Sequence, residues 1–564
     1  MVDVTDGLNA SQRRAVVATE GHLLVAAGPG TGKTMTIVRR CALLLGQGFG
    51  PEEILAVTFT NRAAREMRER MRAFLGPEAA RLFVGTLHLL GLKIMRAAGE
   101  TVGLCTRDEQ VRLLRSVTAS SRAALQLAER ISRVKNLVEV PDPETTRLLE
   151  TYRGLLRAQG LYDFDDLIAV PTRMLEAGRV PAAYAGRFKH IIVDEYQDIS
   201  PVQQKLLGQL VSKGARICAV GDSDQAIYAF RGADVRNFLC FATDFPGAAT
   251  VALTENYRST GMIVRAACSV VRNNRQRLEK ELYAVREEGT PITVCSVPDE
   301  RAEAETVVRE IEARMGPSSH FMLDRAKAAV DFSDRSSSFA DFAVLYRTNG
   351  QARVFKEAFM ERGIPFQAVG GKGPSRRKAL IEELRGQLDT MPDRQDMDAF
   401  WRGLREKGSF PDEEWGLLHN LALAYQDLSP RDALGEVINE LTLFTTADDF
   451  DARAEAVALM TLHAAKGLEF KCVFVAGVEE GLIPFTSGPE GTDMEEERRL
   501  FFVGMTRARD ELFLLHARRR FLFGRQASGL PSPFLAEIPR QLVRQVSVAD
   551  AIKKKGGTQM GLFS

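Results

Sequence analysis

The chain has 564 residues and a formal charge of +1, and 45% of its residues are hydrophobic and 26% charged. This length is too great for one hydrophobic core, so we expect three or four domains. The near-neutral charge excludes a globally basic protein, so any affinity for nucleic acid must come from a local groove. No apolar run approaches the roughly 20 residues that span a bilayer, which excludes a helical membrane protein.

The N-terminal sequence and the cysteines bear on the cell compartment. The first 14 residues, MVDVTDGLNASQRR, lack a positively charged start followed by an apolar stretch, so no secretory signal is expected. Seven cysteines are scattered without a CxxC spacing, which argues against a zinc or iron–sulfur site and indicates buried, reduced thiols. We therefore expect a cytoplasmic protein, associated with the nucleoid if its source is bacterial.

In chain order, the first predicted elements alternate short β-branched or apolar runs with longer helical stretches, a pattern typical of parallel α/β construction. Between residues 87 and 167 the strand signals vanish and a helical periodicity rich in Leu, Ala and Arg replaces them. We predict a first α/β domain at 1–86 and 168–260 with a helical insertion at 87–167. Its predicted strands are 22–27, 54–59, 190–195 and 216–222.

A second α/β set follows, and it too is interrupted by a strand-poor, charged stretch. We predict a second domain at 261–378 and 455–540, a short helical insertion at 379–454 and a flexible tail at 541–564. The segment from Ser318 to Ser338 is rich in Ser and Asp, which indicates a surface loop. The predicted strands of this domain are 290–295, 341–346, 457–463, 472–477 and 511–516.

A glycine-rich segment follows the first predicted strand and precedes a helical run over residues 35–45. In this context glycines let backbone N–H groups turn toward phosphate oxygens at a helix N-terminus, while a lysine neutralises the β and γ phosphates and a threonine hydroxyl binds magnesium. The alternative is a glycine turn with a chance Lys-Thr pair. The predicted nucleotide-binding loop consists of Ala27, Gly28, Pro29, Gly30, Thr31, Gly32, Lys33 and Thr34.

Two carboxylates, Asp194 and Glu195, end the predicted strand at 190–195. Open α/β sheets bind their ligands at the carboxyl ends of the strands. Asp194 can hold magnesium together with Thr34, and Glu195 can orient and deprotonate the attacking water. Such a pair alone is more typical of a solvated strand end, but together with the loop it predicts ATP hydrolysis.

Hydrolysis also needs cations that neutralise charge on the transferring phosphoryl group, and arginine fingers raise the rate by ~10³–10⁵-fold. Arg258, in the sequence ENYR, and Arg507, in GMTRAR, are the candidates. From residue chemistry alone each is better explained as a surface salt-bridge residue.

Nine segments together resemble the UvrD/Rep/PcrA family of superfamily 1A ATP-dependent DNA helicases, from Leu8 to Pro539. The resemblance implies an α/β fold of two RecA-like P-loop NTPase domains, with parallel sheets flanked by helices and a helical insertion in each. It further implies ATP and Mg²⁺ as cofactors, single-stranded DNA and 3′-tailed duplex as partners, and 3′-to-5′ movement. The segments are LNASQ (8–12), AVTFTNRAAREM (56–67), GTLH (85–88), VDEYQD (193–198), VGDSDQAIYAFRGAD (220–234), LTENYRS (253–259), AVLYRTNGQAR (343–353), TLHAAKGLEF (461–470) and EEERRLFFVGMTRAR (495–509).

The resemblance also assigns residues to roles. Around the nucleotide it implies Gln12 as the adenine reader, Tyr257 as the base-stacking ring, Gln225 as the γ-phosphate sensor, Glu469 as a neighbour of the nucleotide, and Arg258 and Arg507 as the fingers. It implies a single-strand track lined by Phe59, Asn61, Thr86, His88, Tyr228, Phe230, Arg231, Arg347 and His463. Aromatic faces stack on any base for ~1–3 kcal/mol each, which suits movement without sequence preference. Without the motif, Tyr228 and Phe230 are better explained as core aromatics.

Three departures from the family pattern limit what the resemblance implies. Met35 stands where many relatives have an arginine near the base, and Phe230 stands where several have tryptophan. The insertion at 379–454 is much shorter than the regulatory lobe of the large relatives. About fifty residues follow Arg509, too few for a separate nuclease domain of usual size.

Three functions remain open from the sequence. The first is a helicase that unwinds duplex DNA in repair, recombination or replication restart. The second is a translocase that strips proteins from single strands without efficient unwinding, and the third is an ATP-switched adaptor for clamp or repair partners. An RNA substrate also remains open, because stacking does not distinguish the sugars.

The C-terminal residues Gln559 to Phe563 resemble the short peptides that dock on sliding clamps through apolar anchors. A frayed chain end explains this segment equally well. The oligomeric state is not fixed by the sequence, and a monomer is assumed.

Overall fold

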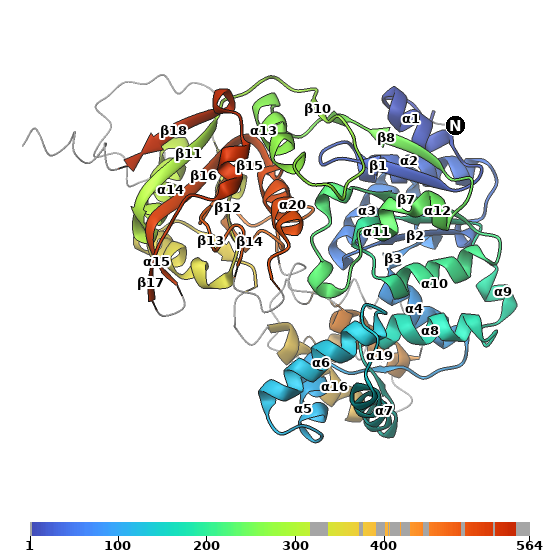
Figure 1. Ribbon diagram of the computed structural model, residues 1–564. Coiled ribbons are helices and arrows are strands. Elements are labelled where there is room, and N and C mark those ends of the chain that lie inside the picture. Colours follow the sequence, from blue (N-terminus) through green and yellow to red (C-terminus); the bar gives the residue numbers. More distant parts are fainter. Residues whose placement is uncertain are drawn as a thin grey trace, which may run out of the picture.

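The computed structural model contains two α/β units side by side, with helical segments on one side of both (Figure 1). It describes residues 3–315, 337–370, 376–390, 401–403, 405, 415, 418, 429–443, 450–486, 491–522 and 525–548. The predicted loop at 318–338 lies almost wholly outside the described residues, and so do most of the predicted tail and the clamp-like peptide. None of the described helices is long and apolar enough to cross a membrane.

The first unit is a six-stranded parallel sheet in the order β3-β2-β6-β7-β1-β8. Its strands are β1 (Leu23–Ala27), β2 (Ile54–Thr58), β3 (Phe83–Thr86), β6 (His190–Val193), β7 (Arg216–Gly221) and β8 (Ala249–Leu253). Its helices are α1 (Ala10–Val17), α2 (Lys33–Gly46), α3 (Asn61–Leu75), α4 (Leu87–Ala97), α8 (Asp166–Glu176), α9 (Ala182–Ala185), α10 (Pro201–Val211), α11 (Arg236–Leu239) and α12 (Phe241–Asp244).

The sequence of β1 shows why this sheet is buried on both faces. Leu24 and Ala26 join the hydrophobic core on one side of the sheet, and Leu23, Val25 and Ala27 join the core on the other. Side chains of a strand alternate between the two faces, so a strand covered by helices on both sides is apolar at every position. This explains the continuous apolar runs from which the strands were predicted.

The first-domain insertion has a hydrophobic core of its own. It contains β4 (Gly103–Leu104), α5 (Arg107–Arg115), α6 (Ser121–Lys135), α7 (Pro143–Ala158) and β5 (Leu161–Tyr162). Residues from Cys105 to Leu156 form this core, whereas Leu90 and Leu92 of α4 and Leu167 of α8 pack into the core of the first sheet. The two connecting helices, α4 and α8, therefore anchor the insertion to the first sheet.

The second unit is an eight-stranded sheet in the order β13-β14-β12-β15-β16-β11-β18, with β17 pairing antiparallel to β16 and the other neighbours parallel. The strands are β11 (Ile292–Asp299), β12 (Phe342–Tyr346), β13 (Phe366–Ala368), β14 (Val457–Thr461), β15 (Phe470–Val475), β16 (Ala508–Leu522), β17 (Arg525–Ser528) and β18 (Val543–Ser547). The helices are α13 (Gly261–Val271), α14 (Glu300–Met315), α15 (Ala352–Arg362) and α20 (Met494–Met505). A short ribbon of β9 (Glu255–Asn256) and β10 (Tyr283–Ala284) lies between the units.

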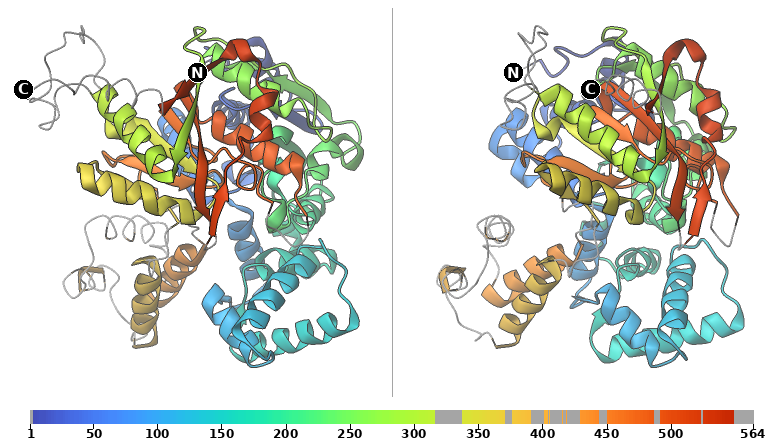
Figure 2. Two further views of the ribbon diagram at one scale, coloured as in Figure 1. Left: turned by 60° about the vertical axis from the view of Figure 1, so that its left-hand side comes forward. Right: turned by 90° about the vertical axis from the view of Figure 1, so that its left-hand side faces the viewer.

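The described part of the second insertion contains α16 (Arg376–Thr390) and α19 (Pro430–Leu443), which share an apolar core. Figure 2 shows both insertions on the same side of the two sheets. The second insertion contacts both the first insertion and the first unit: Arg385 of α16 pairs with Glu109 of α5 at 2.7 Å, and Arg96 of α4 pairs with Glu436 of α19. The α/β fold with parallel sheets, predicted from the sequence, is confirmed, while the exact domain limits stay a prediction.

The cysteines correct one expectation. All seven are free, and five of them are buried. Cys240, however, is exposed and Cys268 is half-buried, so the expectation of buried thiols is wrong for these two.

Candidate functional site

The glycine-rich loop connects β1 to α2 and needs its glycines for steric reasons. Gly30 and Gly32 have φ angles of 69° and 80°, a region that side chains rarely adopt. A Cβ on Gly30 would lie 2.6 Å from the Arg258 Cβ, and a Cβ on Gly32 would lie 2.8 Å from the Gln12 Nε2. The loop therefore packs directly against two of the segments predicted to surround the nucleotide.

The remaining loop residues hold its shape. The Thr31 hydroxyl donates to the Gly28 carbonyl at 2.8 Å, and the Asn256 side-chain amide donates to the Pro29 carbonyl at 2.7 Å. The ammonium group of Lys33 lies 3.4 Å from the Ala27 carbonyl oxygen. Thr34 is half-buried at the second position of α2. This arrangement points backbone N–H groups at the start of α2 toward the space that a phosphate would fill.

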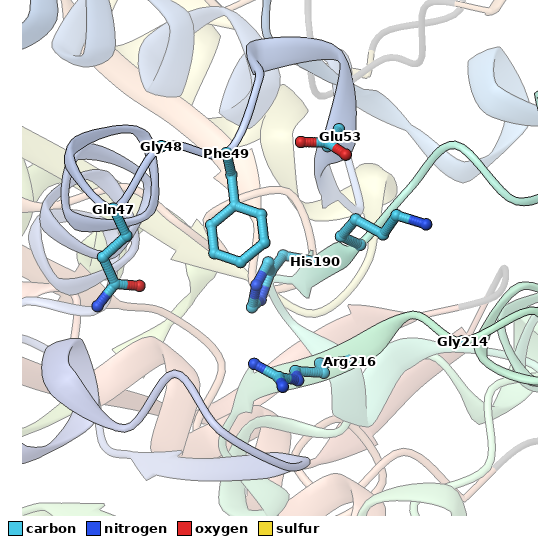
Figure 3. Close-up of a pocket in the computed structure, with 8 residues that line it drawn as sticks. Gln47, Gly48, Phe49, Glu53, His190, Gly214 and Arg216 are labelled. Atoms are coloured by element: carbon cyan, nitrogen blue, oxygen red, sulfur yellow. The ribbon is translucent and has the colours of Figure 1, made fainter.

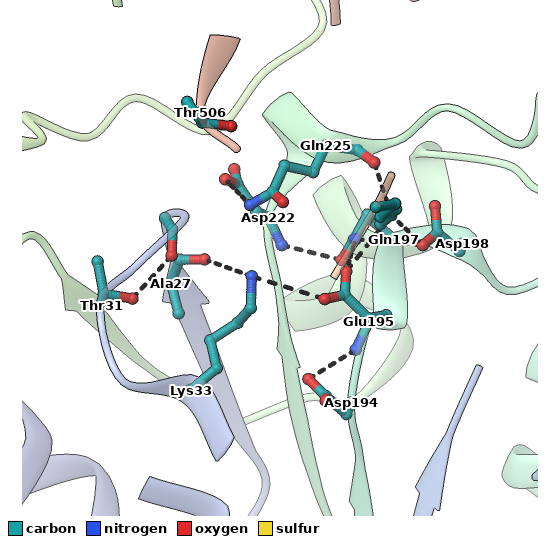
Figure 4. A network of polar contacts seen from close by, with 12 residues as sticks. Ala27, Thr31, Lys33, Asp194, Glu195, Gln197, Asp198, Asp222, Gln225 and Thr506 are labelled. Carbon is teal, nitrogen blue, oxygen red and sulfur yellow. Dashed lines mark hydrogen bonds and ion pairs between the residues drawn. The ribbon is translucent and has the colours of Figure 1, made fainter. Parts of the chain in front are cut away.

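Lys33 faces the two carboxylates at the end of β6, as Figure 4 shows. Its Nζ lies 3.7 Å from the Glu195 Oε1. Glu195 itself has a φ of 54°, an uncommon conformation for a residue with a side chain, and such outliers cluster at functional sites. Burial opposes ionisation of Glu195, but Lys33 and Lys466 outweigh it and hold its pKa at about 2. A carboxylate that stays ionised at neutral pH can accept a hydrogen bond from a water molecule and so orient it.

Asp194 has the opposite environment and fits the role of magnesium ligand. It is buried, and burial followed by the charge of Glu195 raises its pKa to about 7. Among the described residues, only its Oδ1 accepts a hydrogen bond, from the Glu195 N–H at 3.0 Å. A hard cation would favour the ionised form, and Mg²⁺ is usually held by one or two protein oxygens together with phosphates and waters. The hydroxyl of Thr34 and the carboxylate of Asp194 supply that kind of donor set.

A second polar layer connects β6 to β7. The Gln197 side-chain oxygen accepts a hydrogen bond from the Asp222 N–H at 2.9 Å, and its amide donates to Glu195. The Gln225 side-chain amide donates to the Asp222 carboxylate at 2.8 Å. Gln225 is buried and belongs to the same polar network as Glu195 (Figure 4).

Both candidate arginines lie at this site, which the loop and the carboxyl ends of β6 and β7 form and which is called the cleft below. Arg507 is only 1% exposed, and its guanidinium donates to the carbonyls of Val503 and Leu468 and to the Gln225 Oε1, the last at 3.4 Å. Burial and then the nearby Arg258 lower the pKa of Arg507 to about 9. Arg258 pairs with Glu469 at 2.7 Å. The alternative of an isolated surface ion pair does not describe Arg507, which is buried.

Gln12 and Tyr257 lie on the other side of the loop. The Gln12 amide donates to the Thr31 carbonyl at 3.0 Å. The Tyr257 N–H donates to the Gly30 carbonyl at 2.9 Å, and its hydroxyl accepts from the Asn9 side chain at 2.9 Å. The ring of Tyr257 is exposed, so it is free to stack on a planar group beside the loop.

An aromatic cluster joins the two α/β units beside this cleft. Tyr228 stacks on Phe59 with ring centroids 4.8 Å apart and an interplanar angle of 18°. Phe230 meets His463 edge-on at 5.2 Å, and the Arg231 guanidinium lies over both Tyr228 and Phe230. Tyr228 is buried, whereas Phe230 is 64% exposed. The structure thus brings together five of the nine residues predicted to line the track.

The other four predicted track residues make different contacts. Arg347 pairs with Glu497 at 2.7 Å, and the Asn61 amide donates to the Leu443 carbonyl at 2.9 Å. Thr86 is buried and caps α4, because its hydroxyl accepts from the Leu89 N–H. His88 packs on Phe164 with ring centroids 3.9 Å apart, and burial lowers its pKa to about 3. Their assignment to the track stays a prediction.

Sequence reasoning missed several charged residues that the fold brings to this site. Lys466 pairs with Asp198 and with Glu195, the latter at 3.4 Å, and donates to the Gln225 carbonyl at 2.7 Å. Lys280, which lies three residues before β10, forms ion pairs with both Asp222 and Asp224. The motif TLHAAKGLEF contained the signal for Lys466, since its lysine stands between the predicted residues His463 and Glu469.

A hollow in the surface lies away from this site, at the amino ends of β6 and β7 (Figure 3). His190 and Arg216 are the first residues of these two strands, and Phe49 packs edge-on against His190. Parallel α/β sheets bind ligands at the carboxyl ends of their strands. The hollow is therefore not the candidate nucleotide site.

Replacing Phe230 with alanine tests the aromatic cluster. Because its ring is exposed, the substitution leaves no core cavity, and we expect unchanged thermal stability. Loss of one stacking platform is expected to weaken binding to a single strand by about 5- to 150-fold. Fluorescence anisotropy with a labelled oligonucleotide measures this, with Phe521→Ala, another exposed phenylalanine, as the matched control. Unchanged affinity and translocation speed in Phe230→Ala would mean that the track is misplaced.

Comparisons with known proteins agree with this geometry. The chain matches the UvrD/REP helicase N-terminal domain over residues 8–246 and the UvrD-like helicase C-terminal domain over residues 251–410 and 416–519. It is 31% identical to "ATP-dependent DNA helicase PcrA" of Staphylococcus aureus (strain Mu50), over 96% of this chain and 87% of the relative. The protein of the same name from Staphylococcus epidermidis (strain ATCC 35984) is also 31% identical, over 95% of this chain and 87% of the relative.

Among solved structures, a C-terminal domain of a possible DNA helicase from Lactobacillus aligns with 51% of this chain and 98% of its own length. The sequence identity is 14% and the TM-score is 0.25, too low to support an argument about the fold. The two family models together span nearly the whole described chain, and they meet near residue 250, at β8, the last strand of the first sheet. The chain therefore belongs to the UvrD/Rep family of helicases.

Proposed function

We propose that the chain is an ATP- and Mg²⁺-dependent motor that moves 3′ to 5′ on single-stranded DNA and unwinds 3′-tailed duplexes in DNA repair, recombination or replication restart. The name of its staphylococcal relatives, an ATP-dependent DNA helicase, supports the reaction and the substrate. The polarity and the cellular role extend the family resemblance.

One observation supports a motor most strongly: two short chain segments each contribute residues both to the cleft and to the aromatic cluster. Gln225 lies in the cleft, and Tyr228, three residues later, stacks on Phe59. In the other domain, Lys466 pairs with Glu195 in the cleft, and His463, three residues earlier, meets Phe230. A change of charge in the cleft therefore acts on the same short segments that position the rings.

Within the cleft, the residues divide the chemistry of hydrolysis among them. The loop and Lys33 bind the phosphates, Glu195 orients and deprotonates water, and Arg258 and Arg507 neutralise charge on the transferring group. Thr34 and Asp194 would hold Mg²⁺, which supplies further neutralisation of phosphate charge when bound. In the present structure Lys466 pairs with both Glu195 and Asp198, so the carboxylate of Glu195 forms an ion pair with the second domain.

The deciding experiment is ATP- and Mg²⁺-dependent strand displacement on duplexes with a 3′ tail, a 5′ tail or no tail, beside ATPase measured with single-stranded DNA. We expect displacement of the 3′-tailed duplex only. Displacement from the 5′ tail alone would contradict the polarity. ATPase without DNA stimulation and without displacement would favour the ATP-switched adaptor.

The short second insertion supports one alternative. A translocase that strips proteins but separates duplex poorly would show ATPase stimulated by single strands and no displacement. Removal of a tightly bound protein from a single-stranded oligonucleotide, measured as its release on ATP addition, would then identify it.

A further inference from the structure

An exposed apolar loop of the first insertion lies against the segment that carries Phe230. This loop, residues 136–141, follows α6 and is called the lip below. A Cβ on Gly232 would lie 3.1 Å from the Val138 Cγ2 and 3.5 Å from the Asn136 Cβ, so the lip and the 230–232 segment are in van der Waals reach. The lip therefore contacts the chain segment that follows Phe230 and Arg231 of the aromatic cluster.

The lip is apolar on its outside. Val140 is 90% exposed, Leu137 is 53% exposed and Val138 is also exposed. Isolated exposed apolar residues are common, but three within four residues form an apolar patch, and Val138 of this patch lies beside the 230–232 segment, which carries the exposed ring of Phe230. Such a surface marks a site of contact with another molecule.

Ion pairs and hydrogen bonds hold the lip in place. The two carboxylate oxygens of Glu139 accept from Arg130 at 2.9 Å and from Arg133 at 3.2 Å, both on α6. The Asn136 amide donates to Asp165 at 2.7 Å and to the Ser132 carbonyl at 3.0 Å. The lip is thus fixed to the insertion and does not depend on a ligand for its shape, which lowers the entropy lost on binding.

The lip begins with a backbone turn at the end of α6. Leu137 has a φ of 61°, and outside the glycines only Glu195 shares a positive φ among the described residues. Leu137 directly follows the end of α6, and the Val138 N–H donates to the Arg133 carbonyl at 2.9 Å, so this is the left-handed residue with which helices commonly end. The helix end fixes the backbone of the lip, and the leucine side chain at this position is exposed.

The lip also connects to a second aromatic pair. Asp165, which anchors Asn136, adjoins Phe164, and the exposed ring of Phe164 packs on His88. The lip therefore lies beside the segment that carries Phe230, and the hydrogen bond from Asn136 to Asp165 anchors it next to Phe164. All of these residues belong to the first domain or its insertion.

We propose that the lip formed by Leu137, Val138 and Val140 is a contact surface for the unpaired bases of the single strand, which extends the track from Phe230 onto the first-domain insertion. This inference rests on the proposed function. The lip contains no lysine or arginine, and its one charged residue, Glu139, pairs with Arg130 and Arg133 of α6, so the lip offers bases an apolar surface. The contact between the lip and the segment that carries Phe230 selects the strand as the occupant.

The test uses the variant Leu137→Gly/Val140→Ser. Glycine adopts the positive φ of residue 137 without strain and Val140 is almost fully exposed, so the fold is retained. We expect about tenfold weaker binding to a single-stranded oligonucleotide, the factor for losing ~60 Å² of apolar contact. On an oligonucleotide of the same length with abasic sites throughout, which keeps the phosphates and lacks the bases, the variant and the wild type should bind equally.

Leu125→Ser is the matched control, because Leu125 is an exposed leucine on α6, about three helical turns from the lip. It should bind both oligonucleotides like the wild type. Equal affinity of the lip variant and the wild type for the strand with bases would overturn the inference and leave the proposed function intact. An equal loss on both oligonucleotides would also overturn it, because the lip would then act through the phosphates. Failure of the wild type to bind any single strand would reject the proposed function as well.

Discussion

Replacing Lys33 with alanine is expected to lower ATP turnover in the presence of single-stranded DNA by at least ~10²-fold. The Lys33 ammonium group lies between the loop, 3.4 Å from the Ala27 carbonyl, and the Glu195 carboxylate, 3.7 Å away. A charged donor held in this position is aimed at phosphate oxygens, and alanine supplies neither the charge nor the hydrogen bonds. Phosphate release over time measures the effect.

The control for this substitution is Lys189→Ala. Lys189 is exposed at the amino end of β6, whereas Lys33 faces the carboxyl end of the same strand, so the two variants remove the same side chain at opposite edges of one sheet. Both should unfold near the wild-type temperature, and only Lys33→Ala should lose turnover. Normal turnover in Lys33→Ala would remove the assignment of the nucleotide-binding loop.

The strands at the centre of each sheet were predictable because a strand that is buried on both faces has apolar residues at successive positions, which appear as a continuous apolar run in the sequence. β12 repeats the pattern of β1: Phe342, Val344 and Tyr346 enter one core and Ala343 and Leu345 the other. The edge strand β18, by contrast, has largely exposed side chains and a polar sequence, so it gave no such signal. Edge strands follow from pairing partners and not from local hydrophobicity.

The nucleotide loop and the carboxylates of β6 were predictable because each is a local motif with its own geometry. The ion pairs of Lys466 were not, because its partners Glu195 and Asp198 lie more than 250 residues away in sequence. The same holds for Lys280, which meets Asp222 and Asp224 only after the chain has crossed between the two sheets. Side-chain partnerships across a domain boundary depend on the packing of the whole fold.

The sequence also gave no reason to separate Phe230 from Tyr228, although the structure gives them different positions. Tyr228 is buried between Phe59 and the second domain, so it links the domains, whereas Phe230 presents its ring to solvent. Burial of one ring and exposure of its neighbour follow from the turn at residues 229–231, a feature of tertiary structure.

Replacing Arg258 with alanine is expected to lower kcat for ATP hydrolysis by ~10³-fold or more, while the affinity for ATP changes much less. Arg258 pairs with Glu469 and donates to the Thr506 carbonyl at 3.3 Å, beside the buried Arg507. A guanidinium in this position neutralises charge that develops as the phosphoryl group transfers, so its removal affects the transition state more than the bound substrate. Single-turnover hydrolysis and binding of a non-hydrolysable ATP analogue measure the two quantities separately.

Two further variants make this result specific. Arg258→Lys keeps the charge but loses the planar fork of donors, so its kcat should fall between those of the wild type and Arg258→Ala. Arg265→Ala removes an exposed arginine that pairs with Glu288 on the surface, and its kcat should match the wild type. Equal kcat in Arg258→Ala and the wild type would contradict the role of Arg258 as a finger. A parallel loss of kcat and of analogue binding would instead assign Arg258 to uniform binding of the nucleotide.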